Sequence, residues 1–242
     1  MVAAQKDYEQ QIAIGDQIHE QKQRAYCFYG LAYVSWERGD SERAKTLLQQ
    51  SFDLRQKAAE KDLILETRLA QTEIVAAQPS QGALKESLDL AQQFRKEERL
   101  DQAVLADAAL IRAAVNLQPV DVQISGIAAR EIERLLPGIQ DYAIRLSARA
   151  SLAQYNSAIG QNQRALEALR SIIRDAESGG YIVQELERKL MLTKLTLPSK
   201  ERVQIPEEVY RDASLRGLGR IAREAMALIH KPTNSVALST QR

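Results

Sequence analysis

Hydrophobic side chains recur along this chain at the spacing of amphipathic helices. In residues 25–54, apolar positions fall three and four residues apart on both sides of Gly39 and Asp40. That spacing puts them on one face of a helix, whereas a half-buried strand would need strict alternation. Glycine commonly ends a helix and aspartate commonly begins one, so the stretch predicts two helices folded back on each other.

The same pattern continues through the chain, and strand-like alternation is confined to fragments such as residues 120–124. Glycine, proline and serine punctuate the helical stretches. We expect helices over residues 3–18, 22–38, 41–58, 61–77, 81–97, 99–116, 121–136, 139–159, 162–177, 181–195, 207–215 and 218–230. Most connections are short, so successive helices should pack antiparallel. The pattern predicts an all-α protein.

A repeat emerges when the helices are taken in pairs. Small or apolar residues open the second helix of each pair, at Ala4, Ala44, Ala83, Ile124 and Ala165. They stand about 40 residues apart, which is typical of stacked helical hairpins and predicts a right-handed α-solenoid. The predicted domain covers residues 1–230, with a half-repeat at 1–20 and hairpins at 21–58, 61–97, 99–136, 139–177 and 181–230.

The first expected helix occupies the register of the second helix of a hairpin, because Tyr8 falls where Leu48 falls one repeat later. Such a half-unit is expected in the C-terminal part of a longer polypeptide. Without a partner helix, it should expose an apolar edge made of Tyr8, Ile12 and Ile14. That edge is then available for self-association.

Two of the hairpins resemble tetratricopeptide repeats. The matching positions are Leu31, Ala32, Gly39 and Ala44 in one copy, and Leu152, Ala153, Gly160 and Ala165 in the other. The resemblance implies stacked hairpins with a concave groove, and protein binding in that groove. The repeat length and residues 215–225 also resemble the helical arrays of bacterial multidomain regulators, which follow a serine/threonine kinase or a winged-helix domain.

Four aromatic side chains form one stripe on the helix expected at residues 22–38. Tyr26, Tyr29, Tyr33 and Trp36 stand three and four residues apart and therefore share a face. In the register of a tetratricopeptide repeat, this face points into the concave groove. Tyrosine and tryptophan give a partner large contact area at little entropy cost. The same stripe is also compatible with packing against neighbouring hairpins.

The aromatic groove favours a non-catalytic protein–protein interaction module that binds a helix or an extended peptide. The alternative is the regulatory or sensor C-terminal region of a bacterial serine/threonine kinase or transcriptional regulator. The sequence contains no glycine-rich ATP loop, no nucleophile–base pair and no metal-ligand spacing. We therefore expect neither an enzyme nor a bound cofactor.

Composition indicates the partners and the compartment to expect for such a module. The 33 Lys and Arg residues nearly balance the 32 Asp and Glu residues, so no general attraction to nucleic acid or anionic membrane is expected. Cys27 is the single cysteine and is expected to serve in packing. One cysteine forms no internal disulfide, and no apolar run approaches the roughly 20 residues of a membrane span. We expect a cytoplasmic protein.

Two segments depart from the repeat. Residues 196–205 form the longest expected internal loop, and Pro206 follows it at an expected helix start. Residues 231–242 are polar and are expected to form a disordered tail.

Overall fold

The computed structural model describes residues 2–17, 20–196 and 200–230, with only the backbone at 200–203. Within these residues every regular element is a helix, which confirms the all-α class. The elements are α1 (Val2–Gln17), α2 (Gln21–Glu37), α3 (Ser41–Lys57), α4 (Lys61–Ala76), α5 (Gln81–Lys96), α6 (Leu100–Asn116), α7 (Val122–Leu135), η1 (Leu136–Gly138), α8 (Tyr142–Ala158), α9 (Asn162–Gly179), α10 (Ile182–Leu195), α11 (Lys200–Arg216) and α12 (Gly219–Ile229).

Local capping explains several helix starts. The Asp40 side chain accepts a hydrogen bond from the backbone N–H of Arg43 at 3.1 Å, and Ser80 accepts one from Ala83 at 3.1 Å. These bonds satisfy N–H groups that have no partner within the first helical turn. Both caps agree with the sequence prediction.

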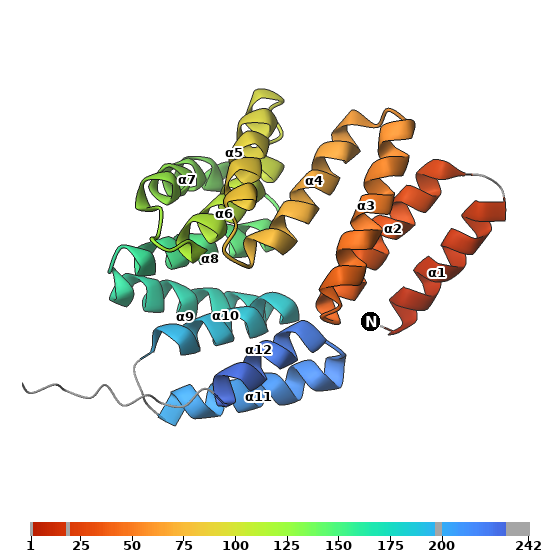
Figure 1. Ribbon diagram of the computed structural model, residues 1–242. Helices are drawn as coiled ribbons and strands as arrows, with labels where there is room; N and C mark the ends of the chain where they lie inside the picture. The colour runs from red at the N-terminus through yellow and green to blue at the C-terminus, as the bar shows by residue number, and fades with distance from the viewer. Residues whose placement is uncertain (1, 18–19, 197–199, 231–242) are drawn as a thin grey trace, which may run out of the picture.

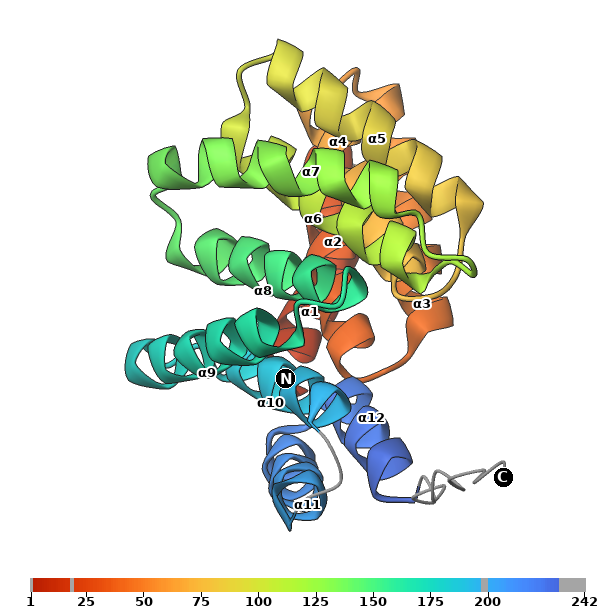
Figure 2. The same ribbon diagram turned by 90° about the vertical axis from the view of Figure 1, so that its left-hand side faces the viewer.

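The helices pack in sequence order. Figure 1 follows them from α1 to α12, and Figure 2 shows the array from the side, from α4 and α5 at the top to α11 and α12 at the bottom. Alternate helices also meet: α4 contacts α6, α6 contacts α8, α8 contacts α10, and α10 contacts α12. This arrangement is expected when each helical pair stacks on the next.

Helix α6 lies at the centre of the largest hydrophobic cluster and contacts α4, α5, α7 and α8. Small side chains let so many helices approach its backbone closely. Its fully buried alanines are Ala103, Ala106, Ala108, Ala109, Ala113 and Ala114.

The array curls until α12 meets α2, as Figure 1 shows at the lower end of the α2–α3 hairpin. Arg220 of α12 forms an ion pair with Glu37, 183 positions earlier. Its guanidinium also lies over the Trp36 ring, 5.2 Å from the centroid. A Cβ atom on Gly219 would lie 2.3 Å from the Arg38 carbonyl oxygen. The glycine therefore permits the close approach of the two helices.

The main difference from the expected helices concerns residues 196–205. Helix α11 already begins at Lys200, so residues 200–205 are not a loop, and Pro206 lies inside the helix instead of at its start. The prediction gave Pro206 the common role of a first helical residue. The residues before it are mostly good helix formers, and they extend the helix on its N-terminal side. The predicted tail, residues 231–242, lies outside the described residues.

Helix α1 does not expose the whole apolar edge predicted for it. Tyr8 and Ile12 are half-buried against the hydrophobic cluster formed by α2, α3 and α4. A Cβ atom on Gly30 would lie 2.3 Å from the Tyr8 ring, so this glycine makes room for it. Of the three predicted edge residues, only Ile14 is exposed, at 49%. The predicted edge is therefore wrong for Tyr8 and Ile12, because α2 covers them.

None of the described helices has the length and the apolar character that crossing a membrane requires.

Candidate functional site

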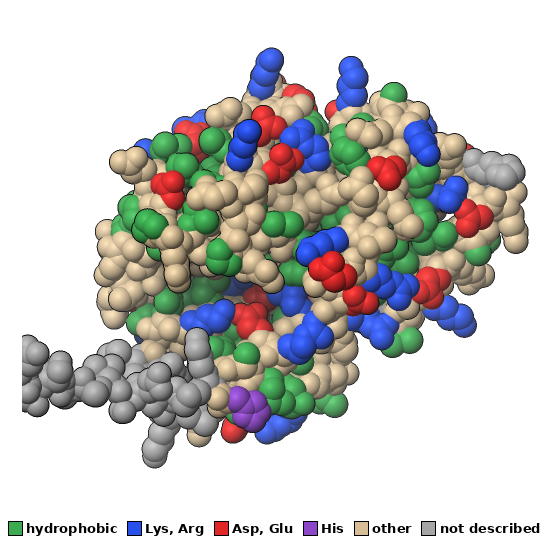
Figure 3. Space-filling model, in the orientation of Figure 1, with side chains coloured by type: hydrophobic (Ala, Val, Ile, Leu, Met, Phe, Trp, Pro, Cys, Tyr) green, Lys and Arg blue, Asp and Glu red, His purple; other side chains and the backbone are tan. Residues whose placement is uncertain are grey.

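A central cavity of about 270 Å³ opens where the even-numbered helices face one another. Each of α2, α4, α6, α8, α10 and α12 contributes to its wall. Figure 3 shows a hollow with acidic and basic side chains between α10 and α12 below and the helices above. Its charged lining residues are Glu37, Glu73, Arg112, Glu187, Arg188 and Arg220.

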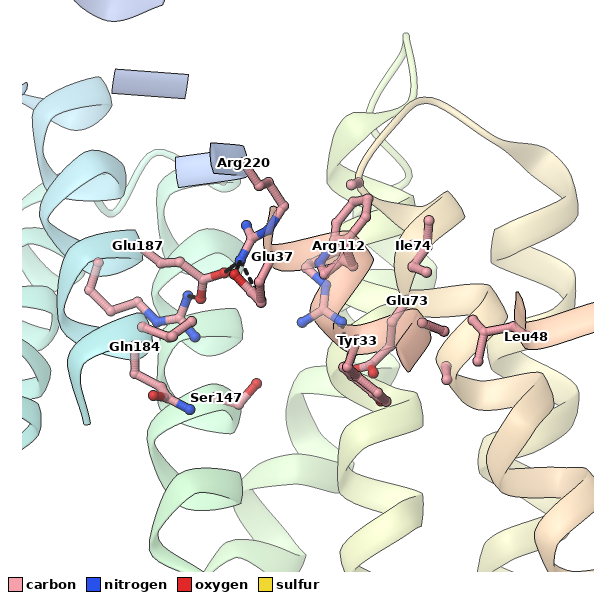
Figure 4. A pocket seen from close by; sticks show the side chains of 16 residues that line it. Tyr33, Glu37, Leu48, Glu73, Ile74, Arg112, Ser147, Gln184, Glu187 and Arg220 are labelled. Atoms are coloured by element: carbon pink, nitrogen blue, oxygen red, sulfur yellow. Dashed lines mark hydrogen bonds and ion pairs between the residues drawn. The ribbon is translucent and has the colours of Figure 1, made fainter. Parts of the chain in front are cut away.

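Arg220 joins three helices at the edge of this cavity. Its Nη2 donates to both carboxylate oxygens of Glu37 at 3.0 Å and to Oε1 of Glu187 at 2.6 Å. Figure 4 shows Arg220 reaching down between the two carboxylates. Burial opposes the charge on Arg220, but the two carboxylates outweigh burial and raise its pKa. The ion pairs thus tie α12 to α2 and α10 at once.

The two carboxylates around Arg220 differ in their titration. Burial raises the pKa of Glu37, and the Arg220 guanidinium offsets only part of that effect. Burial acts on Glu187 in the same direction, but Arg188 and Arg220 outweigh it and lower the pKa of Glu187. Glu187 is thus the more firmly ionised of the two, because it accepts from two arginines.

Two more arginines face the cavity. Nη1 of Arg188 donates to Glu187 at 2.9 Å, and Nη2 of Arg112 donates to Glu73 at 3.2 Å. Burial raises the pKa of Glu73 more than Arg112 lowers it. Arg188 is only 8% exposed, and its Nε finds no acceptor among the described residues. The arginine side of the cluster is therefore incompletely bonded.

A second, shallower hollow lies between α1 and α2, and we call it the tyrosine hollow. It is lined by Ala4, Tyr8, Tyr26, Tyr29, Gly30, Tyr33, Val34 and Glu37. The rings of Tyr29 and Tyr33 meet edge to face with centroids 5.2 Å apart. The Arg55 guanidinium lies over the Tyr29 ring at 4.7 Å and holds it from the α3 side.

The predicted aromatic stripe thus extends along two hollows instead of one groove. Tyr26, Tyr29 and Tyr33 line the tyrosine hollow, while Tyr33 and Trp36 line the central cavity. Tyr26 is 58% exposed and Tyr33 is 41% exposed, so both are accessible to a partner. Trp36 is half-buried under Arg220, which agrees in part with the packing alternative. Partner binding by the four residues stays a prediction.

The charged cluster of the cavity was not singled out from the sequence. Its members are scattered from position 37 to position 220 and form no local motif. One signal was available, because Glu37, Glu73, Arg112, Glu187 and Arg220 stand roughly one or two repeats apart. Aligning the first helices of the hairpins would have placed Glu37, Glu73, Arg112 and Glu187 on one wall, but not Arg220, which lies on the last helix.

Cys27 lies outside both hollows and is fully buried. Its Sγ lies 3.4 Å from the side-chain oxygen of Gln11, and burial raises the pKa of its thiol. Its burial agrees with the packing role predicted for it. In the part of the chain that the structure describes, no three His, Cys, Asp or Glu side chains are arranged to hold a metal ion.

No family model matches the chain, and no curated protein matches it. The resemblance to tetratricopeptide repeats therefore rests on the two sequence copies quoted above.

Proposed function

We propose that this protein is a non-catalytic binding module that takes an extended peptide segment along α2. One observation carries the proposal: the tyrosine hollow and the central cavity share Tyr33 and Glu37 as lining residues. A segment that crosses Tyr33 reaches Tyr26 on one side and Trp36 on the other. All four predicted aromatic residues then contact one continuous ligand.

The dimensions favour an extended segment over a helix. A helix with its side chains is about 10–12 Å wide. The cavity, at about 270 Å³, is close to the lower end of the usual range for small-ligand sites. An extended chain presents single side chains to successive hollows, and rigid aromatic rings are the usual anchors of such contacts.

The finer architecture belongs to the same proposal. We propose a right-handed α-solenoid of the tetratricopeptide type with a repeat of about 40 residues. It is supported by the turn glycines of the two matching copies, since Gly39 and Gly160 both adopt positive φ, at 85° and 82°. This conformation suits glycine and lets one helix end and the next turn back. We expect the module in the cytoplasm.

The test is a display library of short peptides selected on the intact protein, followed by affinity measurements on variants. Tyr26→Ala should weaken binding of a selected peptide by about five-fold or more, as expected for an interface anchor. The melting temperature should stay constant, because the Tyr26 side chain is largely exposed. Tyr26 is a cleaner probe than Trp36, which packs under Arg220.

The matched control is Tyr210→Ala. Tyr210 is also exposed, at 37%, but lies on α11 away from both hollows. Its replacement should leave the affinity unchanged. Failure of the library to yield a binder, or equal losses in both variants, would contradict the proposal.

A regulatory or sensor region of a bacterial kinase or transcriptional regulator is the second candidate. The closure of the array by Arg220 favours it, because a ligand beside these ion pairs can alter how α12 sits on α2. Hydrogen exchange of α12, with and without the selected peptide, tests this function. A change in protection supports it, and unchanged protection argues against it.

A further inference from the structure

We propose that the central cavity is a binding site for a small oxyanion, a carboxylate or a phosphate, held by Arg112, Arg188 and Arg220. This site goes beyond peptide binding and does not depend on it. Both ligands border the central cavity, but the anion contacts its three arginines, whereas the peptide contacts Tyr33 and Trp36 on α2.

The first argument is a surplus of hydrogen-bond donors. A guanidinium carries five N–H groups. Among the described residues, Arg112 donates only from Nη2, Arg188 only from Nη1 and Arg220 only from Nη2. The Nε atoms of Arg188 and Arg220 are buried without an acceptor. These Nε atoms are closed to a ligand, but the Nη groups of the three arginines that donate to no acceptor in the described part of the chain can bind the oxygen atoms of a ligand in the cavity.

The second argument is that the acceptors are already in use. Glu37, Glu73 and Glu187 each accept a hydrogen bond from an arginine within the cavity. A cationic ligand would meet carboxylates whose charge these arginines already neutralise. Because the three arginines balance the three glutamates, an anion meets no net negative charge. The unpaired N–H groups of the three arginines therefore favour an oxyanion.

The third argument is the geometry of the site. Figure 4 shows Arg112 on one side of the open centre, with Glu187, Gln184 and Ser147 on the other. A planar guanidinium presents paired N–H groups that match two oxygens of a carboxylate or phosphate. Gln184 and Ser147 bring uncharged donors to the same space. The volume of about 270 Å³ accommodates a small molecule.

The experiment uses the fluorescence of Trp36, the only tryptophan of the chain, which lines this cavity. The protein is titrated with inorganic phosphate and, separately, with acetate, while sodium chloride keeps the ionic strength constant. We expect a saturable change in fluorescence with at least one of them. A response to phosphate alone identifies a phosphoryl ligand, and a response to acetate alone identifies a carboxylate.

The decisive variant is Arg112→Gln. Because it removes a charged hydrogen-bond donor from the site, it should weaken anion binding about ten-fold or more. The control is Arg68→Gln, which breaks ion pairs outside the cavity, with Glu86 at 2.7 Å and Asp89 at 2.8 Å. This control should bind as the wild type does.

Circular dichroism checks that both variants fold. Should Arg112→Gln fail to fold, Arg112→Lys retains the cation and loses the paired N–H groups, so binding should persist at lower affinity. The proposal is overturned if neither anion gives a saturable change, or if Arg112→Gln, folded, binds as tightly as the wild type. Because no peptide enters this assay, its outcome is independent of the peptide-binding test.

Discussion

Replacing Gly219 by alanine tests whether the array is closed by contact between α12 and α2. On a free helix this change is favourable by up to about 1 kcal/mol, because alanine has the higher helix propensity. In this protein the new Cβ would lie 2.3 Å from the Arg38 carbonyl oxygen and 3.1 Å from its carbonyl carbon. Ordinary contacts begin at about 3.4–3.5 Å, so the helices must separate by roughly 1 Å.

Overpacking of this kind typically costs about 1–3 kcal/mol. Separation also weakens the stacking of Arg220 on Trp36, now at 5.2 Å. After subtraction of the gain in helix propensity, we expect the free energy of unfolding to fall by about 1–2 kcal/mol. For a chain of this length that corresponds to a drop in melting temperature of roughly 2–8 °C. The fluorescence of Trp36 should shift to the red, because the ring gains contact with water.

The control for this prediction is Gly82→Ala. Gly82 also lies in the first turn of a helix, α5, but a Cβ there would meet only Ser80 Oγ, at 3.6 Å. This variant should be unchanged or stabilised by up to about 1 kcal/mol. Thermal unfolding followed by circular dichroism compares the two variants. If Gly219→Ala raises the melting temperature as much as Gly82→Ala does, α12 does not rest on α2 and the closure is wrong.

Two further predictions concern the stability of the scaffold. Glu98 has a φ of 57° in the turn after α5, so Glu98→Gly should stabilise the protein by about 0.5–1 kcal/mol in chemical denaturation, whereas Glu97→Gly, at a φ of −90°, should not. Burial raises the pKa of Asp107 to about 6 from 3.8, although Arg95 lies 2.7 Å away and offsets part of the effect. Between about pH 4 and 6, the folded state therefore keeps a proton on Asp107 that the unfolded state releases. The free energy of unfolding should fall as the pH rises through this window, because the unfolded state binds fewer protons than the folded state. Relative to Asp107→Asn, the fall should reach up to roughly 3 kcal/mol. A difference between wild type and Asp107→Asn that stays constant, or grows with pH, would refute this assignment.

The helices were predictable because their signals are local. The cap at Asp40 and the turn glycine Gly39 lie next to the helices that they delimit, and the apolar spacing repeats within a few residues. The breaks at Ala59 and Glu98 were also predicted, but the backbone conformation of these two turns was not. Both adopt positive φ without a glycine, at 54° and 57°, because the packing of the flanking helices imposes the turn.

The aromatic stripe is the part of the candidate site that could be predicted from local sequence. Periodicity placed Tyr26, Tyr29, Tyr33 and Trp36 on one face of α2, and the structure agrees that neighbours in this series share hollows. Periodicity contains no information on what faces the stripe. Tyr8 of α1 packs at Gly30 in the middle of α2, and Arg220 of α12 lies over Trp36 near its C-terminal end.

The sequence by itself determined a set of helices, their order and one aromatic face, since propensity, capping and hydrophobic spacing act over a few residues. The tertiary structure alone decided that α12 returns to α2 and that six charged side chains enclose a cavity. Glu37 and Arg220 are 183 positions apart, and their encounter depends on the small rotations added by every helix between them. Because those rotations come from side-chain packing over the whole array, no short stretch of sequence contains them.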